Sequence, residues 1–84
     1  MKTLEEIKDV LKKFILEATF APADQVQDDT LIFEQGIFDS MGFISLVTFI
    51  EKTFEINPKD SELLEDNFES INAMANFVQR KLSN

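Results

Sequence analysis

The spacing of apolar residues along the chain predicts three helices, with an irregular stretch between the first two. Near the N-terminus apolar residues recur every three or four positions, which is the spacing of one face of an α-helix. The residues of this face are Leu4, Ile7, Leu11, Phe14, Ile15 and Ala18. Thr3 and Glu6 have the spacing of a capping box, so we expect the first helix from about Leu4 to Glu17.

A second helix is predicted to begin at Asp39 or Ser40, since either side chain can cap the free N–H groups of a first turn. Its core face would hold Phe43, Leu46, Val47, Ile50 and Phe54. Beside this face runs a second, largely apolar stripe, formed by Met41, Ile44 and Thr48. This contact stripe is either ordinary core or a partly open surface for other proteins. Asn57-Pro58 ends the helix, because proline cannot continue one.

The C-terminal third predicts a short helix followed by a longer one. Residues Asp60 to Glu65 leave room for only a short helix, and Asn67-Phe68 is interpreted as a loop anchored by its aromatic ring. Ser70 is predicted to cap the last helix. The inward face of that helix would hold Ile71, Met74, Ala75, Val78 and Leu82. No stretch alternates with period two for more than a few residues, so no sheet is expected.

The segment from Thr19 to Asp39 is a predicted loop of about 20 residues, whereas connections of about 4–6 residues are usual in compact domains. A loop of this length must either be packed down by its own side chains or have a function. The residues available to pin it are Leu31, Ile32, Phe33, Ile37 and Phe38. Asp28-Asp29-Thr30 predicts a short turn or a single 3₁₀ turn. We therefore expect one all-α domain over residues 1–84, with three main helices, one short helix and a long first loop.

Composition excludes several classes of chemistry. The 84 residues include no Cys and no His, which removes thiolate nucleophiles, disulfides, the usual general base and the commonest metal ligand. Neither self-contained catalysis nor a metal site is therefore expected. A calcium loop beginning at Asp24 is disfavoured, because Asp29 stands where glycine is needed and Gln35 where the last acidic ligand is needed.

The charge of the chain argues against nucleic acid as a partner, since phosphate contacts need Lys and Arg and the formal net charge is −8. No Lys or Arg occurs between Phe14 and Glu51. The acidic residues of that stretch are Glu17, Asp24, Asp28, Asp29, Glu34, Asp39 and Glu51. They form either an ordinary solvated surface or an acidic region that steers basic partners toward the molecule.

The chain shows no sign of membrane insertion. Its first residues carry charges where a signal peptide needs an apolar run, and no apolar stretch approaches the roughly 20 residues that span a bilayer. We expect a soluble, cytoplasmic and monomeric protein.

Ser40 is the main candidate for function. With no His or Cys in the chain to activate its hydroxyl, Ser40 is interpreted as the substrate of another enzyme. The order Asp39-Ser40-Met41 at the head of an apolar helix resembles the phosphopantetheine attachment motif of acyl carrier proteins. The long loop, the end of the second helix at Phe54-Glu55-Ile56 and the segment Asn67-Phe68-Glu69-Ser70-Ile71 also fall where that family places them. The resemblance covers essentially the whole chain.

The resemblance implies an acyl-carrier-like four-helix bundle that is modified by other enzymes and is not itself an enzyme. Ser40 is implied as the attachment point of 4′-phosphopantetheine, which a phosphopantetheinyl transferase takes from coenzyme A. Asp39 is implied to help that transferase bind its metal and position the arm. The thiol of the arm would carry an acyl or aminoacyl group as a thioester. Met41 and Ile44, with Thr48 beside them, are implied as contacts for partner enzymes.

The second helix departs from the carriers of bacterial fatty-acid synthesis, in which this helix is usually acidic, because Glu51 is its only carboxylate before Glu55. The segments 33–41 and 65–68 look more like D-alanyl carriers and stand-alone carriers loaded by adenylating ligases. The partners implied are an acyl- or aminoacyl-activating ligase and a downstream acyltransferase or synthase, in a lipid, polyketide, nonribosomal peptide or D-alanylation pathway. The alternative is a helical protein–protein interaction module without a covalent arm, which would use the same contact stripe.

Overall fold

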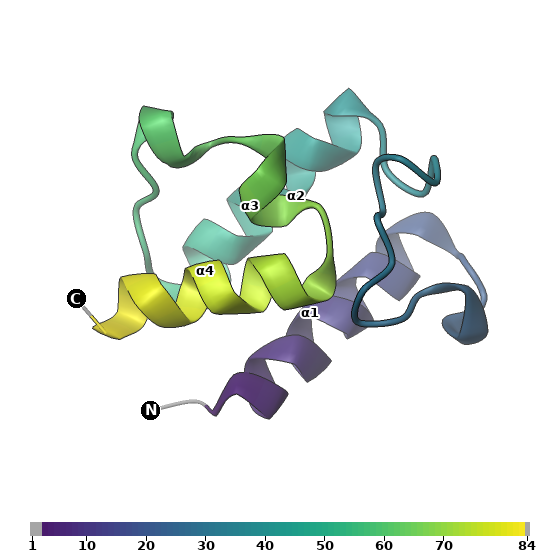
Figure 1. The fold of residues 1–84 in the computed structure, drawn as a ribbon, viewed down its shortest axis with the longest axis horizontal. Helices are drawn as coiled ribbons and strands as arrows, with labels where there is room; N and C mark the ends of the chain where they lie inside the picture. Colours follow the sequence, from purple (N-terminus) through teal and green to yellow (C-terminus); the bar gives the residue numbers. More distant parts are fainter. Residues whose placement is uncertain (1–2, 84) are drawn as a thin grey trace.

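The computed structural model describes residues 3–83, and every regular element among them is helical (Figure 1). The elements are α1 (Leu4–Thr19), the 3₁₀ turn η1 (Ala23–Gln25), α2 (Ser40–Phe54), the 3₁₀ turn η2 (Asp60–Glu62), α3 (Glu65–Phe68) and α4 (Ile71–Ser83). This confirms the all-α prediction of three main helices and one short one. α4 lies at the centre of the bundle and packs against each of the other three α-helices. Within residues 3–83, no helix is long and apolar enough to cross a membrane.

α1 begins with the predicted capping box and runs two residues beyond its predicted end. The Thr3 N–H donates to Glu6 Oε1 over 3.1 Å, and the Glu6 N–H donates to Thr3 Oγ1 over 3.2 Å. The helix ends at Phe20, which has a left-handed backbone with φ 58° and donates its N–H to the Leu16 carbonyl. A left-handed residue at this position closes many helices, although glycine is its usual occupant.

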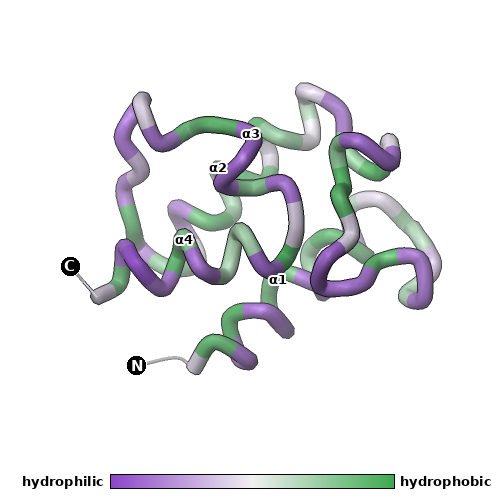
Figure 2. Tube along the Cα trace, viewed as in Figure 1, coloured by the Kyte–Doolittle hydropathy of each residue, from purple (hydrophilic) through white to green (hydrophobic). Residues whose placement is uncertain are grey.

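The core is built from the helical faces that the sequence predicts. Figure 2 shows apolar and polar residues alternating along α1 and α4, as expected for helices with one buried face. The buried apolar residues are Ile7, Leu11, Ile15, Val26, Ile32, Phe38, Leu46, Val47, Ile50, Phe54, Ile56, Phe68, Ile71, Met74, Ala75, Phe77 and Val78. Some residues of the predicted faces are only partly buried at its edge, namely Leu4, Phe14, Phe43 and Leu82, and Ala18 is exposed. Phe77 is buried although it was not predicted to be.

The segment between α2 and α4 differs from its prediction. The expected short helix over Asp60 to Glu65 is instead the turn η2 followed by the separate helix α3, and Asn67-Phe68 belongs to α3 and not to a loop. The reason is tertiary. Phe68 is fully buried, with its ring centroid 5.5 Å from that of Phe43 and 5.1 Å from that of Phe77. Burying this ring stabilises a single helical turn that the local sequence does not favour by periodicity alone.

Glu62 fastens this segment to the end of α4. Its carboxylate accepts the Lys81 ammonium over 2.9 Å and the Lys59 backbone N–H over 2.8 Å. The Lys59 N–H, and then Lys81, stabilise the charged form and lower the pKa of Glu62 from its ordinary value. Asn67 adds a hydrogen bond from its side-chain amide to the Glu62 carbonyl over 2.8 Å.

The long loop between α1 and α2 is packed down, as its apolar residues predict. Val26, Ile32 and Phe38 are buried in the core. Two backbone bonds fix the loop to the junction of α3 and α4, one from the Ile32 N–H to the Glu69 carbonyl and one from the Asn72 N–H to the Asp28 carbonyl, both 2.9 Å long. The predicted turn lies at Asp28-Asp29, while the 3₁₀ turn lies earlier, at Ala23–Gln25.

Candidate functional site

At the start of α2, Asp39 caps the helix and the next residue, Ser40, keeps its hydroxyl free. Asp39 is the N-cap, and its Oδ1 accepts the Gly42 N–H over 2.9 Å. Ser40 is the first helical residue. The sequence left the capping role open between these two residues, and the structure assigns it to Asp39. Because the carboxylate satisfies this N–H, the Ser40 hydroxyl is not needed for the cap.

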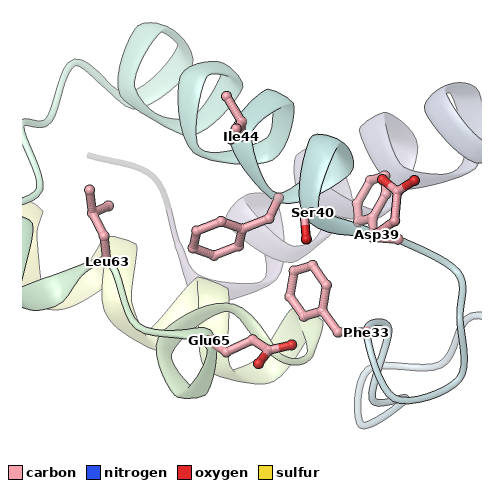
Figure 3. A pocket seen from close by; sticks show the side chains of 8 residues that line it. Phe33, Asp39, Ser40, Ile44, Leu63 and Glu65 are labelled. Carbon is pink, nitrogen blue, oxygen red and sulfur yellow. The ribbon is translucent and has the colours of Figure 1, made fainter.

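Ser40 is exposed, and within residues 3–83 no hydrogen bond engages its hydroxyl. Figure 3 shows the hydroxyl pointing into the space between α2 and the ring of Phe33. In an α-helix the first N–H groups have no partner inside the helix. The backbone N–H groups of Ser40 and Met41 therefore point out of the N-terminal end of α2, where the Ser40 hydroxyl also lies. Ser40 therefore presents a free hydroxyl at the positive end of a 15-residue helix.

A cleft of about 590 Å³ opens directly beside Ser40. Its walls come from the loop before α2, the first turns of α2 and the segment around α3, and Figure 3 shows Leu63 and Glu65 across from α2. The residues that line it are Phe33, Phe38, Asp39, Ser40, Phe43, Ile44, Leu63 and Glu65. The rings of Phe33 and Phe43 meet edge to face with centroids 5.6 Å apart. Five of the eight lining residues are apolar, and the carboxylates of Asp39 and Glu65 are the charged groups.

Gly42 is a positioning residue of this site that the sequence reasoning did not identify. A Cβ at this position would lie 2.5 Å from Cδ1 of Phe38, closer than carbon atoms can approach. The absence of a side chain therefore lets Phe38 pack directly against the first turn of α2. Glycine in a first helical turn, close after an aromatic residue, is the sequence signal for this contact. Gly36, in the loop before α2, has a left-handed φ of 76°, which glycine adopts without strain.

The contact stripe lies open on the surface. Met41 is 71% exposed and Ile44 is 59% exposed, and Thr48 beside them is exposed as well. The hydroxyl of Thr48 donates to the Ile44 carbonyl over 3.0 Å, so this polar group is satisfied within the helix. Of the two interpretations of this stripe, the structure favours the open surface over ordinary core.

The chemistry of the site suits a residue that is modified by another enzyme. The chain has no His or Cys to take a proton from Ser40, and no Lys or Arg between Phe14 and Glu51 to neutralise a phosphate. Within the described part of the chain, no three acidic side chains gather closely enough to hold a metal ion. A phosphate ester on Ser40 would fit the exposed hydroxyl and the free N–H groups at the helix start.

Comparison with known proteins agrees with this geometry. Residues 4–78 match the family described as "Phosphopantetheine attachment site". The D-alanyl carrier proteins of Lactococcus lactis subsp. cremoris strains MG1363 and SK11 are 32% identical to the chain in an alignment of 79 residues, and the alignment covers 92% of this chain and 92% of each relative. The D-alanyl carrier protein of Lactococcus lactis subsp. lactis strain IL1403 has the same identity and coverage. Proteins of this kind bear covalent 4′-phosphopantetheine and are modified by other enzymes without catalysing a reaction themselves. The chain belongs to the family of phosphopantetheine-binding carrier proteins.

Proposed function

We propose that Ser40 is the residue that receives the 4′-phosphopantetheine arm. The supporting observation is its free, exposed hydroxyl at the start of a long helix, beside an apolar cleft. The other described serines are less suited. Ser70 is buried and its Oγ accepts the Ala73 N–H, and Ser45 lies within α2. Ser61 lies in a three-residue 3₁₀ turn, and Ser83 is the last residue of α4, at the negative end of that helix. Only Ser40 among them combines an exposed hydroxyl with a place at the positive end of a long helix.

The modification forms a new P–O bond between Ser40 Oγ and the phosphorus next to pantetheine in coenzyme A. The phosphoanhydride bond to the adenylate half breaks, and adenosine 3′,5′-bisphosphate leaves. The Ser40 proton passes to a base on the transferase, because the chain has no His to accept it. Asp39 would offer a carboxylate oxygen to the Mg²⁺ that the transferase brings, while its Oδ1 continues to cap α2.

The arm supplies a thiol, which this chain lacks, and the proposed cargo is an aminoacyl group held on it as a thioester. D-alanine is the first candidate, because the relatives that cover almost the whole chain are D-alanyl carrier proteins. The scarcity of acid along α2 also separates the chain from carriers of fatty-acid synthesis. An adenylating ligase would load the thiol in the cytoplasm, where ATP is available. A downstream acyltransferase or synthase would then meet the open contact stripe of Met41, Ile44 and Thr48.

The attachment site is tested by incubating the protein without its arm with coenzyme A, Mg²⁺ and a broad-specificity phosphopantetheinyl transferase. Intact mass should increase by one phosphopantetheinyl group in the wild type and in Ser45→Ala, an exposed-serine control on the same helix. Ser40→Ala should show no increase while its far-ultraviolet circular dichroism stays unchanged. Labelling of Ser40→Ala at the wild-type yield would assign the arm to another residue.

The cargo is tested on the protein that carries its arm. With ATP, D-alanine and a ligase that charges D-alanyl carriers, we expect a thioester that hydroxylamine releases as the D-alanyl hydroxamate. Glycine and a medium-chain fatty acid, each with its own activating ligase, are the matched controls. Efficient loading of the fatty acid with none of D-alanine would refute the aminoacyl cargo and leave the role of Ser40 intact.

A further inference from the structure

Phe20 is the most exposed large apolar residue of the described chain. Its side chain is 91% exposed, although the molecule has a core rich in phenylalanine into which other rings pack. A single exposed apolar residue needs no explanation by itself. Phe20, however, also has a left-handed φ of 58°, a conformation that aromatic residues rarely adopt and in which glycine or asparagine is usual.

The backbone around Phe20 is held firmly while its ring is left free. The Phe20 N–H donates to the Leu16 carbonyl over 3.0 Å. The next N–H, of Ala21, donates to Thr19 Oγ1 over 3.3 Å, and that hydroxyl donates to the Ile15 carbonyl over 2.7 Å. Ala21 then packs against the core. A ring on a rigid backbone can be buried by a partner at a low cost in conformational entropy.

Phe20 lies at the same end of the molecule as Ser40. Its neighbour Thr19 lines a shallow hollow of about 300 Å³ whose other wall includes Asp39, Gly42 and Ser45 at the start of α2. This hollow lies on the other side of Phe38 and Asp39 from the cleft beside Phe33, Leu63 and Glu65, because both are lined by those two residues. A partner that reaches Ser40 from the side of α1 therefore passes over the end of that helix.

The surroundings of Phe20 are acidic. The exposed carboxylates of Glu17 and Asp24 flank it in sequence, and Asp39 lies across the hollow. No Lys or Arg occurs between Phe14 and Glu51. A surface that accepts this ring must therefore combine an apolar pocket with a basic rim.

We propose that Phe20 is a docking anchor for the phosphopantetheinyl transferase that modifies Ser40, and that it inserts into an apolar pocket edged by Lys or Arg. The proposal rests on Ser40 being the attachment residue. Charge complementarity selects this partner. An enzyme that delivers a phosphoryl group of coenzyme A to Ser40 must hold the phosphates of coenzyme A with cations, and those cations then face the acidic end of the carrier.

The test compares transferase kinetics on the wild type, Phe20→Asn and Glu55→Asn. Asparagine tolerates a left-handed backbone, so Phe20→Asn removes the ring without disturbing the end of α1. Glu55 is the other non-glycine residue with positive φ, at the end of α2, and serves as the matched control. We expect the KM for Phe20→Asn to rise about tenfold with kcat nearly unchanged, which is typical of an aromatic anchor. The KM for Glu55→Asn should stay within about twofold of wild type.

The dependence of KM on salt concentration distinguishes the contribution of the apolar ring from that of the carboxylates around it. The increase in KM caused by Phe20→Asn should be the same at low and high ionic strength. The double variant Glu17→Gln with Asp24→Asn should instead flatten the dependence of KM on salt. A KM for Phe20→Asn within about twofold of wild type would overturn the proposal, while labelling of Ser40 would still stand. A wild-type dimer in sedimentation that Phe20→Asn abolishes, with unchanged KM, would overturn it in favour of a second copy of this chain.

Discussion

The starts of α2 and α4 use similar residues to different ends. In α4, Ser70 is the cap, is buried, and accepts the Ala73 N–H with its own hydroxyl over 3.1 Å. In α2, Asp39 caps the equivalent N–H, of Gly42, over 2.9 Å, and the serine that follows remains exposed. The comparison teaches that a serine at a helix start becomes available for modification when a neighbour performs the capping. A carboxylate is well suited to this task because it accepts hydrogen bonds without needing a proton.

The two helix starts also differ in what lies behind them. Ser70 is followed in α4 by Ile71 and Met74, which are both fully buried in the core. Ser40 lines an open cleft and is followed by the exposed Met41. One start is therefore structural and the other is presented to partners, although both belong to helices that pack on each other.

The largest expected effect comes from breaking the aromatic link between the two regions. Phe68 is fully buried and contacts Phe43 near the start of α2 and Phe77 within α4. Phe68→Ala should lower the free energy of unfolding by about 3–5 kcal/mol, through lost burial and the cavity left behind. Urea denaturation measures this change. Phe20→Ala is the matched control and should change the value by less than about 0.5 kcal/mol, because its ring is in solvent. Equal effects of the two variants would show that Phe68 does not link the helices.

A smaller effect is expected at the third residue of α2. Intrinsic helix propensity alone predicts that Gly42→Ala stabilises the helix by about 1 kcal/mol. We expect the opposite sign, a loss of about 1–3 kcal/mol, because the new Cβ would collide with the ring of Phe38. The equivalent position of α4 is already occupied by Ala73. A rise in the thermal unfolding midpoint of Gly42→Ala would mean that Phe38 moves aside freely.

The smallest effect on stability concerns the caps themselves. Asp39→Ala and Ser70→Ala should each lower the free energy of unfolding by about 1 kcal/mol, since each removes the acceptor of one N–H group. Their effects on labelling should differ, with Ser70→Ala modified at the wild-type rate and Asp39→Ala modified slowly. Asp39→Asn separates the two roles of this residue, because asparagine caps well but binds Mg²⁺ poorly. Wild-type labelling rates for Asp39→Asn would contradict the metal-binding role.

The sequence predicts well those parts of the fold that rest on repeated local signals. The three long helices follow from apolar residues at helical spacing, and the caps at Thr3 and Ser70 follow from residue type. Which of Asp39 and Ser40 caps α2 does not follow from residue type, because either side chain can cap a helix. The start of α2 was therefore predicted correctly, whereas the availability of the Ser40 hydroxyl had to be observed.

The elements that were missed are short or depend on contacts between distant segments. α3 has only four residues, too few for a periodic pattern, and its helical state follows from burial of Phe68. The close approach of Phe38 to Gly42 and the left-handed backbone of the exposed Phe20 are only weakly indicated by the sequence. Such features are set by how separate segments meet, which apolar spacing does not encode.

The bonds that fix the long loop have a consequence for the timing of synthesis. The loop carrying Phe33 and leading to Ser40 is tied to Glu69 and to Asn72, at the entrance to the last helix. α1 likewise packs against that last helix. A chain emerging from the ribosome therefore lacks these partners until α4 has been made, since contacts between distant segments wait for both of them. Only the finished carrier holds the loop and Ser40 in the arrangement that a modifying enzyme meets.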